Sequence, residues 1–318
     1  MNPALEPPRT TPSPRRVSFI LPCRNAARHL GALVDALRDL VVPPGWEMEI
    51  VAGCQASRDD TLQILKERGV TIAPSNELGA GAARNAAVRS SRGSLLVFMD
   101  SDTLPADNEL LVRIIRKAEE LGTFGGLGGP IRLHPSQAWN PVAIADHYAC
   151  WFNWTESRAS GVTRLFQPTT FFVMPRDVFE QVGGFDVRFL ILEDCELQDR
   201  VIAANKLLYF DRSLSVFHYA RGSLLQSCKH SWAWGPPFRE YFLEHPPLPR
   251  WLITGKRRWF WLNLPSIFWV RLGIIFMKTR REPWARMLYG LPFLLATVLA
   301  WSLGATFGKG SGIGGAER

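Results

Sequence analysis

Two carboxylates follow a short apolar run and are placed to hold a divalent cation. Leu95–Met99 (LLVFM) has the pattern of a buried parallel strand, and Asp100 and Asp102 come directly after it. Open α/β sheets bind ligands at the carboxyl ends of their strands. Carboxylates two positions apart suit Mg²⁺ or Mn²⁺, hard ions that often bridge to phosphate. We expect Asp102 to ligate the ion and Asp100 to hold ribose or a metal-bound water, so that the ion neutralises a departing diphosphate.

A second acidic pair, Glu193 and Asp194, follows the turn sequence GGFD. Displacement of a diphosphate by a hydroxyl needs one carboxylate to take the hydroxyl proton, and this pair can supply it. Gly183 and Gly184 would form a turn beneath the acceptor, with Asp186 capping it or binding a hydroxyl. Two other readings stay open: acids in the first turn of a helix favour the helix dipole, and GGFD is also typical of an ordinary turn.

A glycine-rich segment, GAGAARNAAV, opens a predicted helix at Gly79. Glycines before a helix let backbone amides approach a phosphate, so we predict donor contacts at Gly81, Arg84 and Asn85. Arg84 would pair with the phosphate bidentately. The same small residues would equally fit a tight packing contact of the helix.

His218, in VFHYARGS, is the remaining candidate ligand. Neutral imidazole commonly binds metals, so we expect His218 to act as a third metal ligand or to contact the diphosphate, with Arg221 nearby. A histidine at a strand end that is satisfied by its neighbours remains the alternative.

Strands and helices alternate over the first part of the chain, which predicts an α/β fold with a parallel sheet and right-handed crossovers. The pattern changes after GGLGGP, and residues 135–165 give no clean period, which suits a substrate-specific insert. The expected strands are 17–21, 48–52, 70–73, 95–99, 169–174, 207–210 and 214–219, and the expected helices are 26–40, 62–65, 79–88, 110–121, 177–182 and 195–204.

The composition argues for a cytosolic, membrane-facing protein. The chain has 318 residues, 47% of them hydrophobic, and a net charge of +8. Basic residues crowd the C-terminal part among Trp-rich apolar runs, which favours an anionic membrane surface over nucleic acid. Five cysteines without a CxxC pair argue against a disulfide framework or a zinc site. Residues 1–16 hold five prolines and no apolar run, so we expect a disordered tail without a secretory signal.

Two apolar stretches near the C-terminus predict membrane helices. Residues 287–307 carry no charge and are long enough to cross a bilayer. Residues 259–277 are also apolar, but Arg271 interrupts them. They would form a second span, a re-entrant segment or a helix in the interface. Basic residues between the two stretches favour a cytoplasmic loop.

Four motifs in this order resemble glycosyltransferase family 2, whose members are inverting enzymes with the GT-A fold, a mixed sheet with flanking helices. VSFILPCRN at 17–25 is similar to the opening strand of the family, GAGAARNAAV to its GxxxARN segment, and DSD to its DxD motif. GGFD followed by EDCELQDR resembles the acceptor-side pair that carries the catalytic base. The resemblance covers about residues 17–235, which leaves 236–318 as a membrane-associated region.

The resemblance implies roles for individual residues. Asp194 would be the general base, and Glu193 would orient the acceptor. The end of the first strand would contact the donor through Pro22, Arg24 and Asn25. The family's chemistry implies a nucleotide-sugar donor and Mg²⁺ or Mn²⁺.

The predicted nucleoside pocket departs from the family pattern. In place of DDGSxD the chain has GCQASRDD, so Cys54 and Gln55 replace the acids, and only Ser57 and Asp59 stay in register. Gln55 can still bond a base edge through its amide, but the donor base is left open. The QxxRW motif of processive members is absent from the sequence, which reads QSCKHSWAWG locally and favours transfer of one sugar per encounter.

These features together predict a membrane-associated, bacterial-type, non-processive glycosyltransferase on the cytoplasmic face of an inner membrane. The acceptor would be lipid-linked or an envelope glycan precursor. One alternative is a non-catalytic scaffold that binds sugar or nucleotide, which GCQASRDD supports and the intact DSD and EDCE oppose. Another is a nucleotidyltransferase, but PCRNAARHL lacks the glycine-rich loop expected after its first strand.

Overall fold

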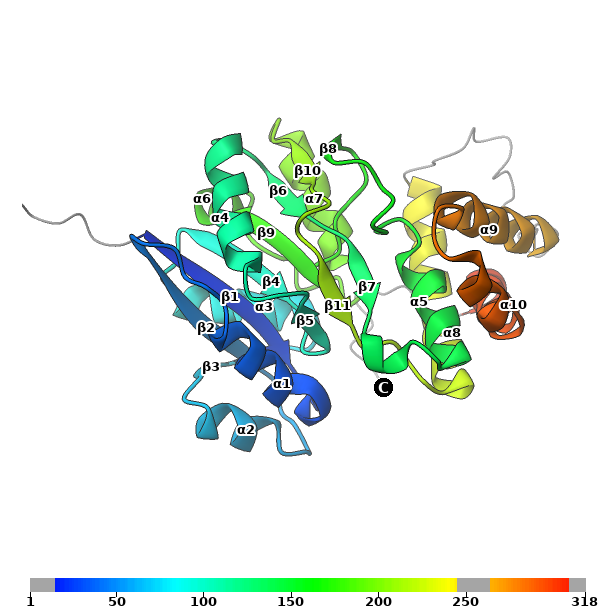
Figure 1. The fold of residues 1–318 in the computed structure, drawn as a ribbon, viewed down its shortest axis with the longest axis horizontal. Coiled ribbons are helices and arrows are strands. Elements are labelled where there is room, and N and C mark those ends of the chain that lie inside the picture. The colour runs from blue at the N-terminus through cyan, green and yellow to red at the C-terminus, as the bar shows by residue number, and fades with distance from the viewer. Residues whose placement is uncertain (1–14, 245–263, 309–318) are drawn as a thin grey trace, which may run out of the picture.

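The computed structural model describes residues 15–244 and 264–308, and a large mixed β-sheet forms its centre (Figure 1). Its strands lie in the order β3-β2-β1-β4-β9-β6-β10-β8. The first four of these run parallel, and β9 is antiparallel to both β4 and β6, which confirms the predicted mixed α/β sheet. The strands are β1 (Arg15–Cys23), β2 (Trp46–Cys54), β3 (Thr71–Pro74), β4 (Leu95–Met99), β6 (Gly126–Gly128), β8 (Gly161–Thr163), β9 (Phe171–Pro175) and β10 (Leu208–Phe210).

Helices cover both faces of this sheet, which explains the uninterrupted apolar run of β4. Leu95, Val97 and Met99 point into one core, and Leu96 and Phe98 point into the other. Residues of α1, α2 and α4 complete the first core, and residues of α3, α6 and α7 complete the second. The helices are α1 (Ala27–Arg38), α2 (Thr61–Glu67), α3 (Ala80–Ser90), α4 (Leu110–Leu121), α6 (Arg176–Gln181) and α7 (Glu193–Ala203).

A smaller three-stranded sheet continues from the end of β4. Its central strand, β11 (Val216–His218), is antiparallel to β5 (Thr103–Pro105) and parallel to β7 (Ile131–Leu133). The register of β11 on β5 pairs His218 with Thr103, the residue that follows Asp102. The small sheet therefore brings the predicted histidine beside the DSD segment.

The remaining helices form a group beside the sheet (Figure 1). They are α5 (Pro141–Trp151), α8 (Leu224–Glu244), α9 (Leu264–Thr279) and α10 (Trp284–Phe307). Helices α8 and α10 approach closely at two glycines, because a Cβ on Gly304 would lie 2.2 Å from the carbonyl oxygen of Trp232, and one on Gly235 would lie 2.2 Å from the nitrogen of Ala305. Small residues at a crossing let helix backbones come together.

Helix α5 lies within residues 135–165, where the sequence shows no clean period. The helix begins at Pro141 after an Asn140 cap, whose side chain accepts hydrogen bonds from the backbone of Val142 and Ala143. The seven residues from Ala143 to Ala149 are all buried. A helix buried on every side has no polar face, so no helical period shows in its sequence.

Among the helices in residues 15–244 and 264–308, α10 is the one long and apolar enough to cross a membrane. About 44% of its most apolar window is buried inside the protein. Helix α9 is too short to qualify, and the first part of the predicted second stretch, 259–263, lies outside the described residues, as does most of the predicted tail. The predicted boundary at residue 235 lies inside α8, which runs on to Glu244.

Candidate active site

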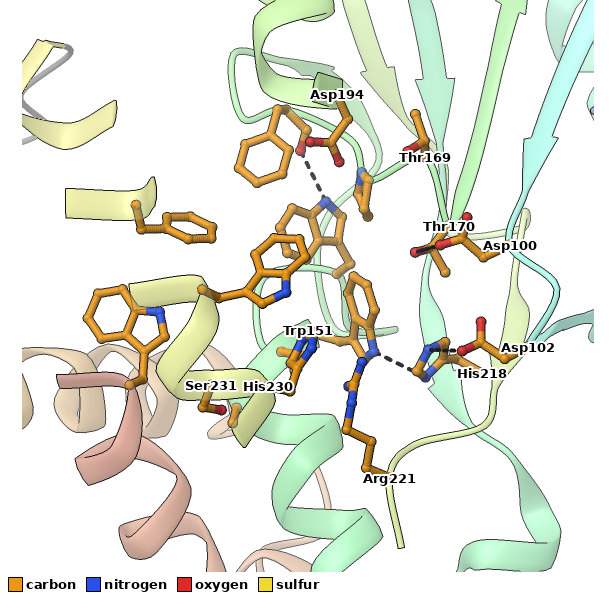
Figure 2. A pocket seen from close by; sticks show the side chains of 18 of the residues that line it. Asp100, Asp102, Trp151, Thr169, Thr170, Asp194, His218, Arg221, His230 and Ser231 are labelled. Atoms are coloured by element: carbon orange, nitrogen blue, oxygen red, sulfur yellow. Dashed lines mark hydrogen bonds and ion pairs between the residues drawn. The ribbon is translucent and has the colours of Figure 1, made fainter. Parts of the chain in front are cut away.

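Two cavities meet at the carboxyl ends of β1 and β4. The strand-end cavity, of about 370 Å³, is lined by the ends of β1 and β2 and the start of α3. The helix-side cavity, of about 190 Å³, extends from the same point to residues of α5, α8, α9 and α10 (Figure 2). The residues that line both cavities are Arg84, Asp100, Asp102 and Glu193.

Arg84 connects the two acidic motifs. Its side chain is 3% exposed, and its two terminal nitrogens bond Asp100 Oδ1 and Glu193 Oε1, each at 2.7 Å. Asp100 Oδ2 also accepts a hydrogen bond from Thr170 Oγ1 at 2.8 Å, a contact that the sequence did not predict. The expected bidentate pairing of Arg84 with a phosphate is therefore corrected, because carboxylates already hold both nitrogens. Glu193, expected to orient the acceptor, is likewise tied to Arg84.

Asp102 lies beside His218, as predicted (Figure 2). Its Oδ2 is 3.6 Å from His218 Nε2. Trp151 Nε1 donates a hydrogen bond to His218 Nδ1 at 3.3 Å, so the proton of the neutral imidazole lies on Nε2 and points toward Asp102. Ligation of a metal through Nε2 would require the other tautomer and the loss of the Trp151 bond. Of the two, Asp102 would thus be the more direct ligand of a metal.

The surroundings of Asp102 suit a divalent cation. Its side chain is 41% exposed and lines both cavities, and the loss of solvation, with the charge of Asp100, raises its pKa. A bound cation would favour the charged carboxylate. Residues 15–244 and 264–308 contain no group of three His, Cys, Asp or Glu side chains placed to hold a metal. An ion at Asp102 would therefore complete its coordination with substrate phosphate oxygens and water, as Mg²⁺ commonly does.

Asp194 lies in the first turn of α7 and lines the helix-side cavity (Figure 2). The preceding Leu192 has a left-handed φ of 67°, a strained conformation for leucine at the point where the chain turns into the helix. Burial, together with the charge of Glu193, raises the pKa of Asp194 to about 7. A carboxyl group with that pKa can accept a proton near neutral pH, as a general base must.

Asp102 and Asp194 line the same cavity although they come from different elements. Asp102 follows β4, and Asp194 begins α7. A reacting group in this cavity would thus meet a candidate metal ligand and a carboxyl group with a raised pKa.

Five of the predicted donor residues line the strand-end cavity: Arg84 and Asp100, described above, and Pro22, Arg24 and Gln55. Gln55 is 7% exposed, and its Nε2 donates to the backbone carbonyl oxygens of Gly79, at 2.9 Å, and Glu77. Because the amide nitrogen is used internally, the side-chain oxygen is the group that remains to accept a hydrogen bond from a ligand.

The other predicted residues of the nucleoside pocket hold two loops together instead. The backbone nitrogen of Asn25 donates to Ser57 Oγ at 3.1 Å, and Asn25 Oδ1 accepts from the backbone of Arg58 at 2.8 Å. Asp59 Oδ2 accepts from the backbone of Ala27 at 3.0 Å. Asn25, Ser57 and Asp59 do not line either cavity, and their hydrogen bonds position the loops after β1 and β2, so their donor contacts stay a prediction.

Gly81 and Asn85 form packing contacts of α3, which is the alternative to phosphate binding that their sequence left open. A Cβ on Gly81 would lie 3.1 Å from the Cβ of Phe185 and 3.4 Å from the Cγ of Glu193. The amide of Asn85 bonds both the nitrogen and the oxygen of the Phe185 backbone, at 3.0 and 2.8 Å. Both residues hold the GGFD turn against α3, and neither lines the cavities.

The GGFD turn is also structural. Gly183 and Gly184 have φ values of +84° and +70°, which suit glycine, and Asp186 forms an ion pair with Arg188 at 2.6 Å. None of these three predicted acceptor residues lines the cavities. The predicted acceptor contacts of these three residues therefore stay a prediction.

The sequence missed the residues that form the far wall of the helix-side cavity. They come from α5, α8, α9 and α10 and from the loops after α5, β8 and β11, which are distant in the chain. Among them, Arg221 was expected near His218. The aromatic and basic members of this wall are Trp151, Trp154, Phe166, Arg221, Trp234, Phe238, Arg271 and Trp301.

A comparison with protein families decides the classification. The family model described as Glycosyl transferase family 2 matches residues 18–183, more than half of the chain. The chain belongs to glycosyl transferase family 2. The match includes Asp102 and every residue that lines the strand-end cavity except Glu193, and the family is one of glycosyltransferases.

Several curated proteins are similar to this chain. The O-antigen chain rhamnosyltransferase RfbN of Salmonella typhimurium is 24% identical, over 59% of this chain and 62% of its own length. The succinoglycan biosynthesis protein ExoA of Rhizobium meliloti is 24% identical over 73% of this chain and 71% of its own length. The pre-mycofactocin glycosyltransferase of Mycobacterium tuberculosis is 26% identical over 75% of this chain and 50% of its own length. The chain thus spans less than two thirds of the rhamnosyltransferase.

Solved structures confirm the GT-A-like fold. The mannosyltransferase PcManGT from Pyrobaculum calidifontis, in complex with GDP-Man and Mn²⁺, has a TM-score of 0.58 and 15% identity, covering 96% of this chain and 92% of its own. At this level of identity the likeness shows the fold alone. It includes the region of α8, α9 and α10, because nearly the whole chain is covered.

Proposed function

We propose that the protein is an inverting, non-processive glycosyltransferase that moves one sugar from a nucleoside diphosphate donor to a hydroxyl group. The observation that carries this proposal is the single cavity lined by Asp102 and Asp194, which joins the strand-end cavity at Asp100. The donor nucleotide would occupy the strand-end cavity and its diphosphate would lie at the junction. The acceptor would enter the helix-side cavity.

In this proposal Asp194 takes the proton of the acceptor hydroxyl as its oxygen attacks the anomeric carbon. The pKa of about 7 lets the carboxylate do so near neutral pH. Attack from the face opposite the diphosphate inverts the anomeric centre. Arg84 positions the base indirectly, because it holds Glu193, the neighbour of Asp194.

Mg²⁺ or Mn²⁺, held by Asp102 with His218 beside it, would supply Lewis-acid stabilisation of the departing diphosphate. Asp100 would contribute through its position next to the ion, since both of its oxygens already accept hydrogen bonds from Arg84 and Thr170. Mn²⁺ accompanies GDP-Man in the structure of the mannosyltransferase with a similar fold.

The acceptor we propose is a lipid-linked or envelope glycan precursor at the cytoplasmic face of the inner membrane. Two similar proteins are named for O-antigen and succinoglycan biosynthesis. Helix α10, the candidate span, contributes Trp301 to the helix-side cavity, which would bring the site close to a bilayer. The basic residues before α10 favour a cytoplasmic position for that end.

Calorimetry with Mn²⁺ across uridine, guanosine and thymidine diphosphate sugars tests the donor assignment. We expect one donor class to bind and to be turned over by the wild-type chain. Asp102→Ala and Asp194→Asn should each abolish turnover, and Asp194→Asn should still bind the donor. Equal turnover by all three proteins would refute the proposal.

A second candidate is a membrane scaffold that binds nucleotide-sugars without turning them over. The replacement of the usual acids by Cys54 and Gln55 favours it, since the pocket is altered where the family binds the nucleoside. Binding of a donor with neither hydrolysis nor transfer, in the presence of extracted lipid-linked glycans, would support this candidate.

A further inference from the structure

Arg271 of α9 brings a positive charge to the wall of the helix-side cavity. Its Nη2 donates to the carbonyl oxygen of Ala149 at 2.9 Å, and its guanidinium carbon lies 4.0 Å from the ring centre of Trp301 and 5.6 Å from that of Phe152. Its Nε is buried and has no hydrogen-bond partner among the described residues. None of the ion pairs found within residues 15–244 and 264–308 includes Arg271.

A guanidinium placed in this way favours an anionic ligand. Removing a cation from water is costly unless an opposite charge and hydrogen bonds compensate it. Two groups offset part of this desolvation cost for Arg271. They are the carbonyl of Ala149, near the C-terminal end of α5, and the ring of Trp301. Phosphate oxygens match the planar fork of arginine donors, so a phosphate group in the cavity would pair with the terminal nitrogens of Arg271.

The charged residues that line the cavity come from different elements. Asp102 follows β4 and Asp194 begins α7, and the basic residues Arg221 and Arg271 come from the loop after β11 and from α9. Arg221 already forms an ion pair with the fully buried Asp146, at 3.3 Å. Arg84 is likewise paired with Asp100 and Glu193, so Arg271 is the lining arginine to which no ion pair is assigned among the described residues, and an anionic group of the acceptor would be held there.

The apolar surface of the cavity fits the rest of such an acceptor. Indole rings of α5, α8 and α10 line the cavity, and Trp301 both contacts Arg271 and belongs to the candidate membrane helix. We propose that Arg271 binds the phosphate that joins lipid to glycan in a lipid-linked acceptor, whose sugar hydroxyl faces Asp194 and whose apolar chain leaves the cavity along α10. The proposal rests on the proposed function, because it concerns the acceptor of the same site.

Calorimetry of the full chain in detergent, with farnesyl phosphate and uncharged farnesol as probes, tests this assignment. We expect the wild type to bind farnesyl phosphate about tenfold more tightly than farnesol, the effect of one charge-assisted contact. Arg271→Gln should bind both probes equally, and Arg271→Lys should keep part of the preference. Arg280→Gln, which removes the same charge from an exposed position after α9, should bind as the wild type does.

A wild type that binds the two probes equally would overturn the proposal, even if Arg271→Gln failed to fold. A folded Arg271→Gln variant that still bound farnesyl phosphate more tightly than farnesol would also overturn the proposal. Arg271 would then serve only to bond the C-terminal end of α5. Binding of a nucleoside diphosphate with Mn²⁺ is measured on the same samples. If that binding and sugar transfer persist while the probe preference is absent, only this inference fails; if the nucleotide does not bind, the proposed function fails.

Discussion

Arg84 lies 2.7 Å from Glu193, although the two residues are 109 positions apart in the chain. The same guanidinium holds Asp100, so one buried side chain fixes the end of β4 relative to the start of α7. Asp194 directly follows Glu193 in the sequence. The proposed base therefore depends for its position on a residue that the sequence alone assigned to the donor phosphate.

Replacement of Arg84 by Met should destabilise the protein and abolish transfer. The change leaves Asp100 and Glu193 without their buried partner, which costs roughly 3–5 kcal/mol for a buried pair. The free energy of unfolding, from denaturant titration followed by circular dichroism, measures this loss. Arg89→Met, on the exposed face of the same helix, should change stability by less than about 0.5 kcal/mol. Equal stability of the two variants would show that the bridge through Arg84 contributes nothing.

The rate of transfer should fall on the acid side of neutrality. Asp194 has a pKa raised to about 7, and only its deprotonated form accepts the proton of the acceptor. The turnover number should therefore decrease about tenfold per pH unit well below pH 7 and level off above it. The profile is measured with saturating donor, acceptor and Mn²⁺. Asp194→Asn should show a low rate that does not fall further below pH 7. A wild-type rate that falls only near pH 4 would contradict the assignment of Asp194 as the base.

Loss of the Asp102 carboxylate should remove the dependence on a divalent cation. We expect Asp102→Ala to lower turnover by about 100-fold or more, because the ion stabilises the leaving diphosphate by several kcal/mol. Titration of Mn²⁺ into the assay and calorimetry of Mn²⁺ with a nucleoside diphosphate provide the measurements. Asp177→Ala, at an exposed position of α6, is the matched control. An Asp102→Ala enzyme that still responds to Mn²⁺ would place the ion elsewhere.

The sequence predicted the central sheet because its signals are local. The apolar run of Leu95–Met99 and the acids after it report burial on two faces and the end of a strand, and both features lie within a few positions. The register of β11 on β5 makes Asp102 and His218 neighbours, and the sequence does not show that register. The residue types alone were enough to propose both as metal ligands.

The far wall of the cavity was not predictable in the same way. Trp151, Arg271 and Trp301 belong to three helices that meet only in the folded chain. Asn25 and Asn85 show the opposite error, since their types suit a ligand but their amides serve loops and turns. Hydrogen bonds to the backbone leave no periodic trace in a sequence, so only the structure separates these residues from those that face the cavities.

The crossing of α8 and α10 should depend on Gly304. A Cβ at this position would lie 2.2 Å from the carbonyl oxygen of Trp232, and backbone atoms cannot move aside as a flexible side chain would. We expect Gly304→Ala to lower the free energy of unfolding by about 1–3 kcal/mol, the usual effect of overpacking. Thermal unfolding of the full chain in detergent measures it. Gly273→Ala in α9 has open space around its Cβ and should instead be neutral or stabilise the helix by up to about 1 kcal/mol.

Because α10 supplies Trp301 to the cavity, Gly304→Ala should also weaken acceptor use while donor binding is unchanged. Equal behaviour of the two variants would show that α8 and α10 do not pack in this way.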